Sequence, residues 1–183
     1  MDSYIDIKVK PDAEMRVNVL LNKVYSQFHK ALCTLDASNI GVSFPRYRVL
    51  LGDVIRIHAT SQRLLELQNL HWLGGLIDYC ELSPIHAVPN RVHYRIISRK
   101  QANMSEAKLR RLIKRGSIRP EDIKKYRVKM FSQGLNNAYF ELESQSNQHK
   151  HRRYIQFGTL CAERKRGKFD LFGLSTEATI PWF

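Results

Sequence analysis

The segment YIDIKVKPDAEMRVNVLLNKVYSQFHKALCTL, Tyr4–Leu35, contains the two patterns that decide the fold. Its first six residues, Tyr4–Val9, alternate apolar and polar side chains, which is typical of a strand with one buried face. Pro11 ends this strand, and Asp12 is placed to cap a long helix from about Ala13 to Leu35. One face of that helix is apolar: Val17, Leu20, Leu21, Val24, Phe28, Ala31, Leu32 and Leu35. The segment therefore predicts a strand followed by an amphipathic helix, with His29 at the border of the apolar face.

The following residues predict two strands, a second helix and a fourth strand. Thr60 or Ser61 is placed to cap the second helix, which runs to about Leu70. The three strands are IGVSF (Ile40–Phe44), DVIRIHAT (Asp53–Thr60) and LIDYCEL (Leu76–Leu82). The order β-α-β-β-α-β is that of the ferredoxin-like, or split βαβ, arrangement. We therefore expect residues 1–90 to form a ferredoxin-like domain that carries the histidine helix.

The loop SPIHAVPNRV, with two prolines, is the expected junction to a second domain at residues 91–183. A helix is predicted from about Met104 to Arg115, with Asn103 at its cap and Glu106 in capping-box spacing. KYRVKMFS is compatible with either a helix or a strand. Strands are predicted for VHYRIISR (Val92–Arg99), YFELESQS, RRYIQFGTLC and KFDLFGLS. The chain as a whole is predicted to be α+β, with a second α/β domain that carries an arginine-rich helix.

The net positive charge comes entirely from the second half of the chain. The net charge is +13; residues 1–90 hold nine basic and nine acidic residues, and residues 91–183 hold the other 21 basic and eight acidic ones. A basic surface that served only solubility would not stop at mid-chain. The asymmetry favours a nucleic-acid partner over an acidic membrane surface or an acidic protein, and it does not distinguish DNA from RNA.

A row of basic residues follows one side of the predicted helix EAKLRRLIKRG. Lys108, Arg111, Lys114 and Arg115 share that side, and Leu109, Leu112 and Ile113 are predicted to turn toward a core. Such a row can meet phosphates along a groove, whereas the alternative is a solvated basic face. Arg99 and Gln101, at a predicted strand end beside this helix, are residue types that make bidentate contacts with bases.

Several other classes of protein find no support in the sequence. No apolar run is long enough to cross a bilayer, and the N-terminus predicts neither a signal nor a transit peptide. Cys33, Cys80 and Cys161 are far apart, which indicates reduced thiols in a cytoplasm-like compartment. His149 and His151 lack a third ligand at a suitable spacing, and no P-loop, GxGxxG or nucleophile elbow is present. We therefore expect no metal and no cofactor.

Three stretches together resemble the CRISPR-associated endoribonuclease family of the type I-F system. The opening MDSYIDIKVKPDAE is similar to that of the family, and the helix ending FHKAL and the segment IGVSFP follow in the family's order. SQS (Ser144–Ser146) and the closing FGLSTEATIPWF look like the family's final region. The motifs are short, but their order, spacing and full-length span make the combination specific.

The resemblance implies an activity that cuts precursor CRISPR RNA at its repeat hairpins. In this family a ferredoxin-like domain precedes a domain whose arginine-rich helix enters the major groove of the stem-loop. Cleavage is metal-independent: the 2′-hydroxyl attacks the adjacent phosphate and leaves a 2′,3′-cyclic phosphate and a 5′-hydroxyl. The enzyme then stays on the 3′ hairpin within a type I-F crRNA-guided surveillance complex, in the cytoplasm of a prokaryote.

The resemblance also implies roles for individual residues. His29 matches the histidine that removes the 2′-hydroxyl proton, and Ser144 matches the serine that holds this hydroxyl. An imidazole suits this task because its reference pKa lies near 6.5. The RNA-binding residues would be Arg99, Gln101, Lys108, Arg111, Lys114, Arg115 and Ser146. His151 stands where the family can carry an aromatic ring on the terminal base pair, with Lys150, Arg152 and Arg153 beside it, and Phe172 stands where a tyrosine is frequent.

Two hypotheses remain open. The first is the metal-independent endoribonuclease, and the second is a non-catalytic RNA-hairpin-binding subunit that caps a CRISPR surveillance complex. They share every basic residue and differ only at His29 and Ser144. Presence of both residues favours the nuclease, and predicts that His29 faces a cleft between the domains. A ribosomal-type or DNA-binding basic protein is a more distant alternative, and the sequence does not distinguish defence from transposon targeting.

Overall fold

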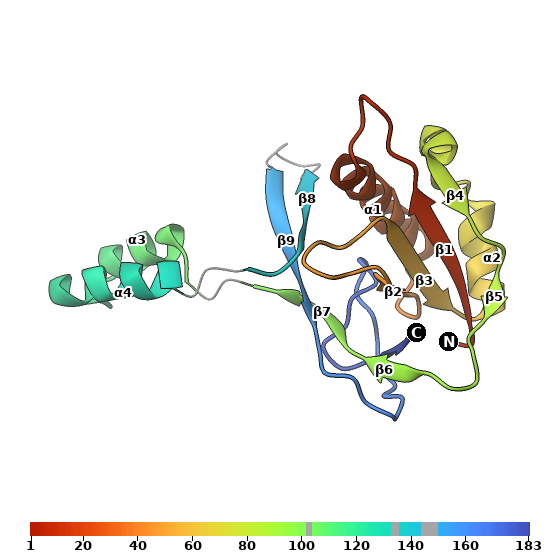
Figure 1. The fold of residues 1–183 in the computed structure, drawn as a ribbon. Helices are drawn as coiled ribbons and strands as arrows, with labels where there is room; N and C mark the ends of the chain where they lie inside the picture. Colours follow the sequence, from red (N-terminus) through yellow and green to blue (C-terminus); the bar gives the residue numbers. More distant parts are fainter. Residues whose placement is uncertain (102–103, 133–135, 144–149) are drawn as a thin grey trace.

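The computed structural model describes residues 1–101, 104–132, 136–143 and 150–183, and these residues form a mixed α+β fold (Figure 1). The elements of the first half are β1 (Ser3–Val9), α1 (Val17–Leu35), β2 (Gly41–Ser43), β3 (Val54–Ala59), α2 (Ser61–Asn69), the 3₁₀ helix η1 (Gly74–Tyr79), β4 (Cys80–Leu82) and β5 (His86–Ala87). Those of the second half are β6 (His93–Arg95), β7 (Ile97–Lys100), α3 (Glu106–Lys114), α4 (Pro120–Ser132), β8 (Tyr139–Glu143), β9 (Lys150–Phe157) and β10 (Ile180–Trp182).

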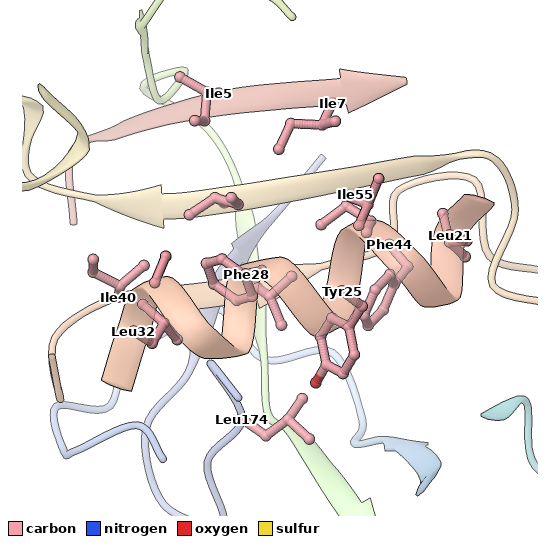
Figure 2. Packing of buried hydrophobic residues seen from close by; sticks show 14 of the residues in the cluster. Ile5, Ile7, Leu21, Tyr25, Phe28, Leu32, Ile40, Phe44, Ile55 and Leu174 are labelled. Carbon is pink, nitrogen blue, oxygen red and sulfur yellow. The ribbon is translucent and has the colours of Figure 1, made fainter. Parts of the chain in front are cut away.

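The first half folds around an antiparallel sheet with strand order β2-β3-β1-β4, and β5 pairs with the start of β1. Buried and half-buried residues alternate along β1, as its sequence predicts. Ile5 and Ile7 point from this strand toward α1 (Figure 2). Thr60 caps α2 by accepting a hydrogen bond from the backbone N–H of Arg63, which confirms the predicted start of that helix.

The core is a continuous apolar cluster between this sheet and α1. Tyr25, Phe28 and Leu32 of α1 are fully buried, and Figure 2 shows Leu32 near Ile40 and Tyr25 near Phe44. Leu174, from the closing segment of the chain, lies next to Tyr25 in the same cluster. The closing segment therefore contributes to the same core as α1 and the N-terminal sheet.

The first helix begins four residues later than its sequence predicts. Asp12 does not cap it, because the Asp12 carboxylate accepts hydrogen bonds from the backbone N–H groups of Glu14 and Met15 and closes a local turn. Such side chain–backbone bonds compete with helix formation. α1 instead begins at Val17, after Arg16, whose side chain makes no capping bond.

The predicted strand Leu76–Leu82 is wrong over its first half. Gly74–Tyr79 forms η1, and only Cys80–Leu82 pair with β1. Leu76 and Tyr79 both pack against the core, and their spacing of three residues matches the period of a 3₁₀ helix. The pair of glycines at 74 and 75 favours this turn, since Gly74 has a φ of +51°.

Three further expectations for the second half are corrected. Val92–Arg99 is not one strand: β6 pairs with β10, and β7 pairs with β9, so the chain leaves one sheet and enters another at Ile96. KFDLFGLS is a turn rather than a strand, because the Asp170 carboxylate accepts two backbone hydrogen bonds within it. The ambiguous KYRVKMFS belongs to α4.

α3 and α4 form a helical hairpin that projects away from the rest of the chain (Figure 1). Ser105 caps α3 by accepting from the backbone N–H of Lys108, so the cap predicted at Asn103 is wrong, and Asn103 itself lies outside the described residues. Arg127 of α4 and Glu106 of α3 form an ion pair at 2.9 Å between the two helices.

The three-stranded sheet has the order β7-β9-β8 and lies against α1. Phe140 of β8 stacks on Tyr25 with ring centroids 3.8 Å apart, which fixes β8 on the helix that carries His29. No helix in the described part of the chain is long and apolar enough to cross a membrane.

Candidate active site

His29 lies half-buried on α1, one residue beyond the fully buried Phe28. Its Nδ1 is 2.7 Å from the backbone carbonyl oxygen of Leu171. A carbonyl oxygen can only accept a hydrogen bond, so Nδ1 must carry the proton and donate it. In the neutral imidazole, Nε2 is then the nitrogen that can accept a proton from a ligand.

The turn at residues 170–174 holds this carbonyl in place. The Asp170 carboxylate accepts hydrogen bonds of 2.9 Å from the backbone N–H groups of Phe172 and Leu174. Gly173 has a φ of +70°, and a Cβ built there would lie 3.0 Å from Phe28 and 3.2 Å from Val42. Only glycine fits without a shift, since both the backbone conformation and the close approach exclude a side chain.

Phe172 lies between two nitrogen-containing side chains. Its ring stacks on the imidazole of His29, with centroids 3.6 Å apart and planes inclined by 10°. The guanidinium carbon of Arg153 lies 3.4 Å from the same ring centroid. The Phe172 carbonyl accepts a hydrogen bond of 2.9 Å from the hydroxyl of Tyr25. The ring is therefore fixed by the core of the protein and in turn limits how the imidazole can rotate.

A cavity of about 1000 Å³ opens where α1 faces β8 and β9, and His29 lies in its wall. Its lining combines cationic, amide and carboxylate side chains with a few apolar ones. The lining residues are Asn22, Lys23, Ser26, Gln27, His29, Lys30, Leu76, Glu141, Leu142, Glu143, His151, Arg153 and Phe172. A cavity of this size can hold a nucleotide, since ligand pockets commonly have volumes of 300–1,000 Å³.

One face of the three-stranded sheet supplies two nitrogen-containing side chains of this wall. His151 and Arg153 alternate with Arg152 along β9 and therefore share a face, which they also share with Phe140 and Leu142 of β8. Burial lowers the pKa of Arg153 from its ordinary value, but an arginine stays charged at neutral pH. The cavity thus combines the His29 imidazole with a desolvated arginine.

The structure brings His29, His151 and Phe172 together at this cavity and leaves other predicted residues elsewhere. Ser144 and Ser146 lie outside the described residues; the strand before them ends at Glu143, which lines the cavity. Arg152 is exposed and forms an ion pair of 3.2 Å with Glu141. Its guanidinium also lies 4.6 Å from the ring centroid of Tyr139.

The basic helix residues lie on the projecting hairpin rather than at the cavity. Lys108, Arg111, Lys114 and Arg115 are exposed, and Arg99 and Gln101 are exposed at the end of β7 from which the hairpin departs. The prediction that three apolar residues of α3 turn toward a core holds for Leu109, which is fully buried. It is wrong for Ile113, which is 44% exposed because α4 covers only part of the helix.

The sequence analysis did not assign several residues of the cavity wall to the site. Asn22 stands seven residues before His29 and shares its side of α1, so helical spacing could have revealed it, whereas Lys23, Gln27 and Lys30 line the cavity from farther round the helix. The burial of Arg153 had no such signal, because it stands in a basic run that reads as exposed. In the part of the chain that the structure describes, no three His, Cys, Asp or Glu side chains gather as a metal-binding cluster.

The arrangement defines a class of protein: a mixed α+β chain with a histidine base in a cation-rich cavity and a separate basic helix. Residues 4–183 match the family described as CRISPR-associated protein (Cas_Csy4). The CRISPR-associated endonuclease Cas6/Csy4 of Escherichia coli (strain UTI89 / UPEC) is 34% identical over 184 residues and covers all of both chains. That of Pseudomonas aeruginosa (strain UCBPP-PA14) is 34% identical over 187 residues, again over the full length of both.

The chain therefore belongs to the Cas_Csy4 family of CRISPR-associated proteins, and these relatives place it among the endonucleases. A solved structure of Thermus thermophilus Cse3, bound to an RNA representing a pre-cleavage complex, is similar at a TM-score of 0.40. It is 11% identical in sequence and covers 99% of this chain and 100% of that one.

Proposed function

We propose that this protein is a metal-independent endoribonuclease that cuts precursor CRISPR RNA at the base of its repeat stem-loops. The observation that carries the proposal is the bond between His29 Nδ1 and the Leu171 carbonyl, at the wall of a cavity that can hold a nucleotide. Family membership and the names of the two relatives, both CRISPR-associated endonucleases, support the substrate class.

In the proposed reaction, Nε2 of His29 takes the proton of the 2′-hydroxyl upstream of the cut. The 2′-oxygen then bonds to the adjacent phosphorus, and the bond from phosphorus to the 5′-oxygen breaks. The products are a 2′,3′-cyclic phosphate and a 5′-hydroxyl, whose oxygen takes up a proton. Ser144 is proposed to hold the attacking hydroxyl, because in-line attack needs a fixed ribose and phosphate.

Recognition is proposed to fall to the second half of the chain. α3 would lie along the groove of the stem-loop and place Lys108, Arg111, Lys114 and Arg115 near phosphates. Arg99 and Gln101, at the base of the hairpin of helices, would contact bases, with Ser146, His151 and Arg152 near the cut. The exposure of α3 supports this role, since a basic helix that faces solvent is free to meet RNA.

The proposal includes the organisation of the chain and its setting. Residues 1–90 would be a ferredoxin-like domain, which the element order and the strand order β2-β3-β1-β4 support, and residues 91–183 would be the RNA-binding domain. After cleavage the enzyme would stay on the 3′ hairpin as a subunit of a type I-F surveillance complex in the prokaryotic cytoplasm.

The test is cleavage of a labelled repeat hairpin in EDTA by the wild type, His29→Ala and the control His86→Ala, an exposed histidine of β5. We expect the wild type and the control to cut and to leave a cyclic phosphate. His29→Ala should bind the hairpin with an affinity within about threefold of wild type and show no cutting. Binding by the wild type without any cutting would establish the non-catalytic hairpin-binding subunit instead, and loss of cutting in EDTA would refute metal independence.

A further inference from the structure

We propose that Arg153 binds the scissile phosphate and is a catalytic residue of the same reaction. This inference rests on the proposed function and deepens it. It assigns the stabilisation of the negative charge that develops on the phosphate to the guanidinium of Arg153, which lies on the opposite side of the Phe172 ring from His29. Arg153 is the strongest candidate in the molecule because its burial, its unsatisfied Nε and its position agree.

Arg153 is a buried cation that its own surroundings satisfy only in part. The residue is only 7% exposed, and its Nε has no hydrogen-bond partner among the described residues. Within the same part of the chain no carboxylate forms an ion pair with it; Glu141, which also lines the cavity, is paired with Arg152 instead. The favourable contacts of Arg153 are the face of the Phe172 ring and, without an ion pair, the charge of Asp170. An external anion would compensate a buried charge that the protein satisfies only in part.

The position of Arg153 relative to His29 suits a reaction at one nucleotide. Both groups stack on the Phe172 ring, at 3.4 Å and 3.6 Å from its centroid, so they must lie on opposite faces of it. Both also line the same cavity. A base and a cation separated by one ring can therefore reach the ribose 2′-oxygen and the phosphate that follows it.

Attack of the 2′-oxygen on the phosphate needs a group that stabilises negative charge. When the 2′-oxygen bonds to phosphorus, the non-bridging oxygens gain negative charge before the bond to the 5′-oxygen breaks. A guanidinium offers two parallel N–H donors that match two phosphate oxygens, and removal from water strengthens this interaction. Arg153 gives up no proton in this step: the 2′-hydroxyl proton goes to His29, and the guanidinium stays charged throughout.

If Arg153 pairs with the scissile phosphate, removing its charge should have opposite effects on stability and on activity. Arg153→Met keeps an unbranched side chain on Phe172 and removes the charge, so its melting temperature should equal or exceed that of the wild type. Its single-turnover cleavage rate should fall roughly 100- to 1,000-fold, which is typical for loss of one donor to a developing oxyanion. Arg48→Met is the matched control, because Arg48 is exposed between β2 and β3 and does not line the cavity.

A purely structural Arg153 would give the reverse pattern: a lower melting temperature for Arg153→Met, with cleavage within threefold of wild type in the folded protein. That result would overturn the inference. Arg153→Lys keeps the charge but loses the fork, and it should cut at a rate between those of wild type and Arg153→Met. If Arg153→Lys were no faster than Arg153→Met, the assigned role of the charge would be refuted.

Direct contact with the phosphate is tested by removing the charge on the RNA. The probe is a repeat hairpin with a 2′-deoxyribose at the attacking position and a methylphosphonate in place of the scissile phosphate. The wild type should bind this probe about tenfold more weakly than the matching 2′-deoxy phosphate hairpin, whereas Arg153→Met should bind both within twofold. Equal losses in both proteins would refute the contact. Cleavage of the unmodified hairpin by the wild type tests the proposed endoribonuclease function separately. Failure of that function and failure of the Arg153–phosphate contact are therefore distinguishable.

Discussion

The imidazole of His29 and the phenyl ring of Phe172 lie face to face, with centroids 3.6 Å apart. The stack fixes the plane of the imidazole, and the Leu171 carbonyl one residue earlier fixes its proton on Nδ1. A tyrosine hydroxyl is therefore not needed to orient this histidine, because the backbone provides the hydrogen-bond acceptor. The departure from the family at position 172 removes a hydroxyl and leaves both constraints on the base.

The stack gives a first prediction. Phe172→Leu should reduce the single-turnover cleavage rate about two- to tenfold, because an aromatic pair contributes roughly 0.5–1.5 kcal/mol beyond its area. Hairpin affinity should stay within twofold, since the ring orients the base rather than the RNA. Phe172→Tyr keeps the ring and should cut like the wild type. A Phe172→Tyr enzyme as slow as Phe172→Leu would show that the ring face is not the relevant contact.

The turn that presents Leu171 gives a second prediction, on stability. Gly173→Ala should lower the free energy of unfolding by roughly 2–4 kcal/mol, because a left-handed residue and an overpacked contact each add a penalty. The control is Gly116→Ala, whose φ of +65° is similar but whose Cβ would meet open space. It should lose only about 1–2 kcal/mol, from the backbone conformation alone. Urea denaturation measures both, and equal losses would contradict the close packing at Gly173.

The basic helix gives a third prediction, on salt dependence. If Arg111 and Arg115 contact phosphates, each change to alanine should reduce the slope of log affinity against log salt by roughly 0.7–0.9. Affinity should fall for all hairpins of the same shape, because a phosphate contact carries no sequence information. Arg48→Ala is the control for loss of one exposed charge, and its slope should equal that of the wild type. Unchanged slopes in Arg111→Ala and Arg115→Ala would mean that α3 faces away from the RNA backbone.

His58 gives a fourth prediction, on pH. It is fully buried, its Nε2 is 2.8 Å from the Ser43 hydroxyl oxygen, and burial lowers its pKa to about 3. Its reference pKa when unfolded is about 6.5, so below that pH the unfolded chain takes up a proton that the folded chain refuses. The stability that His58 provides is therefore complete above about pH 6.5 and is lost as the pH falls toward 3.

The effect is measurable by urea denaturation between pH 6.5 and pH 5. Over this range the wild type should lose about 2 kcal/mol more than His58→Gln, in which the titrating group is absent. His86→Gln removes an exposed histidine and should keep the wild-type dependence. Parallel pH profiles for the wild type and His58→Gln would show that His58 is protonated in the folded protein.

The sequence predicted the elements whose periodicity the core itself determines. β1, α1, β2, β3 and α2 follow from alternation and helical spacing, because their buried faces meet in one cluster. Two of the errors fall where a local hydrogen bond decides the outcome: Asp12 delays α1, and Asp170 turns the chain where a strand was expected. Such competition between a carboxylate and the secondary structure does not change the hydrophobic pattern, so the pattern could not reveal it.

For the site, the sequence indicated His29, His151 and Phe172 through a resemblance, and the structure places all three at one cavity. It could not indicate the Leu171 carbonyl, since a backbone atom has no signature in the sequence. Nothing in the sequence indicated the burial of Arg153, because every residue of HKHRR reads as exposed, and only the strand register turns Arg153 inward onto the Phe172 ring.

The α3–α4 hairpin is inserted between β7 and β8, and these two strands pair with opposite edges of β9. α1, β8 and β9, whose residues line the cavity, belong to the body from which the hairpin projects (Figure 1). If α3 recognises the RNA as proposed, recognition and bond cleavage are encoded in separable stretches of the chain. A hairpin taken from a relative could replace residues 102–135 and redirect the enzyme to another RNA, with the chemistry left as it is.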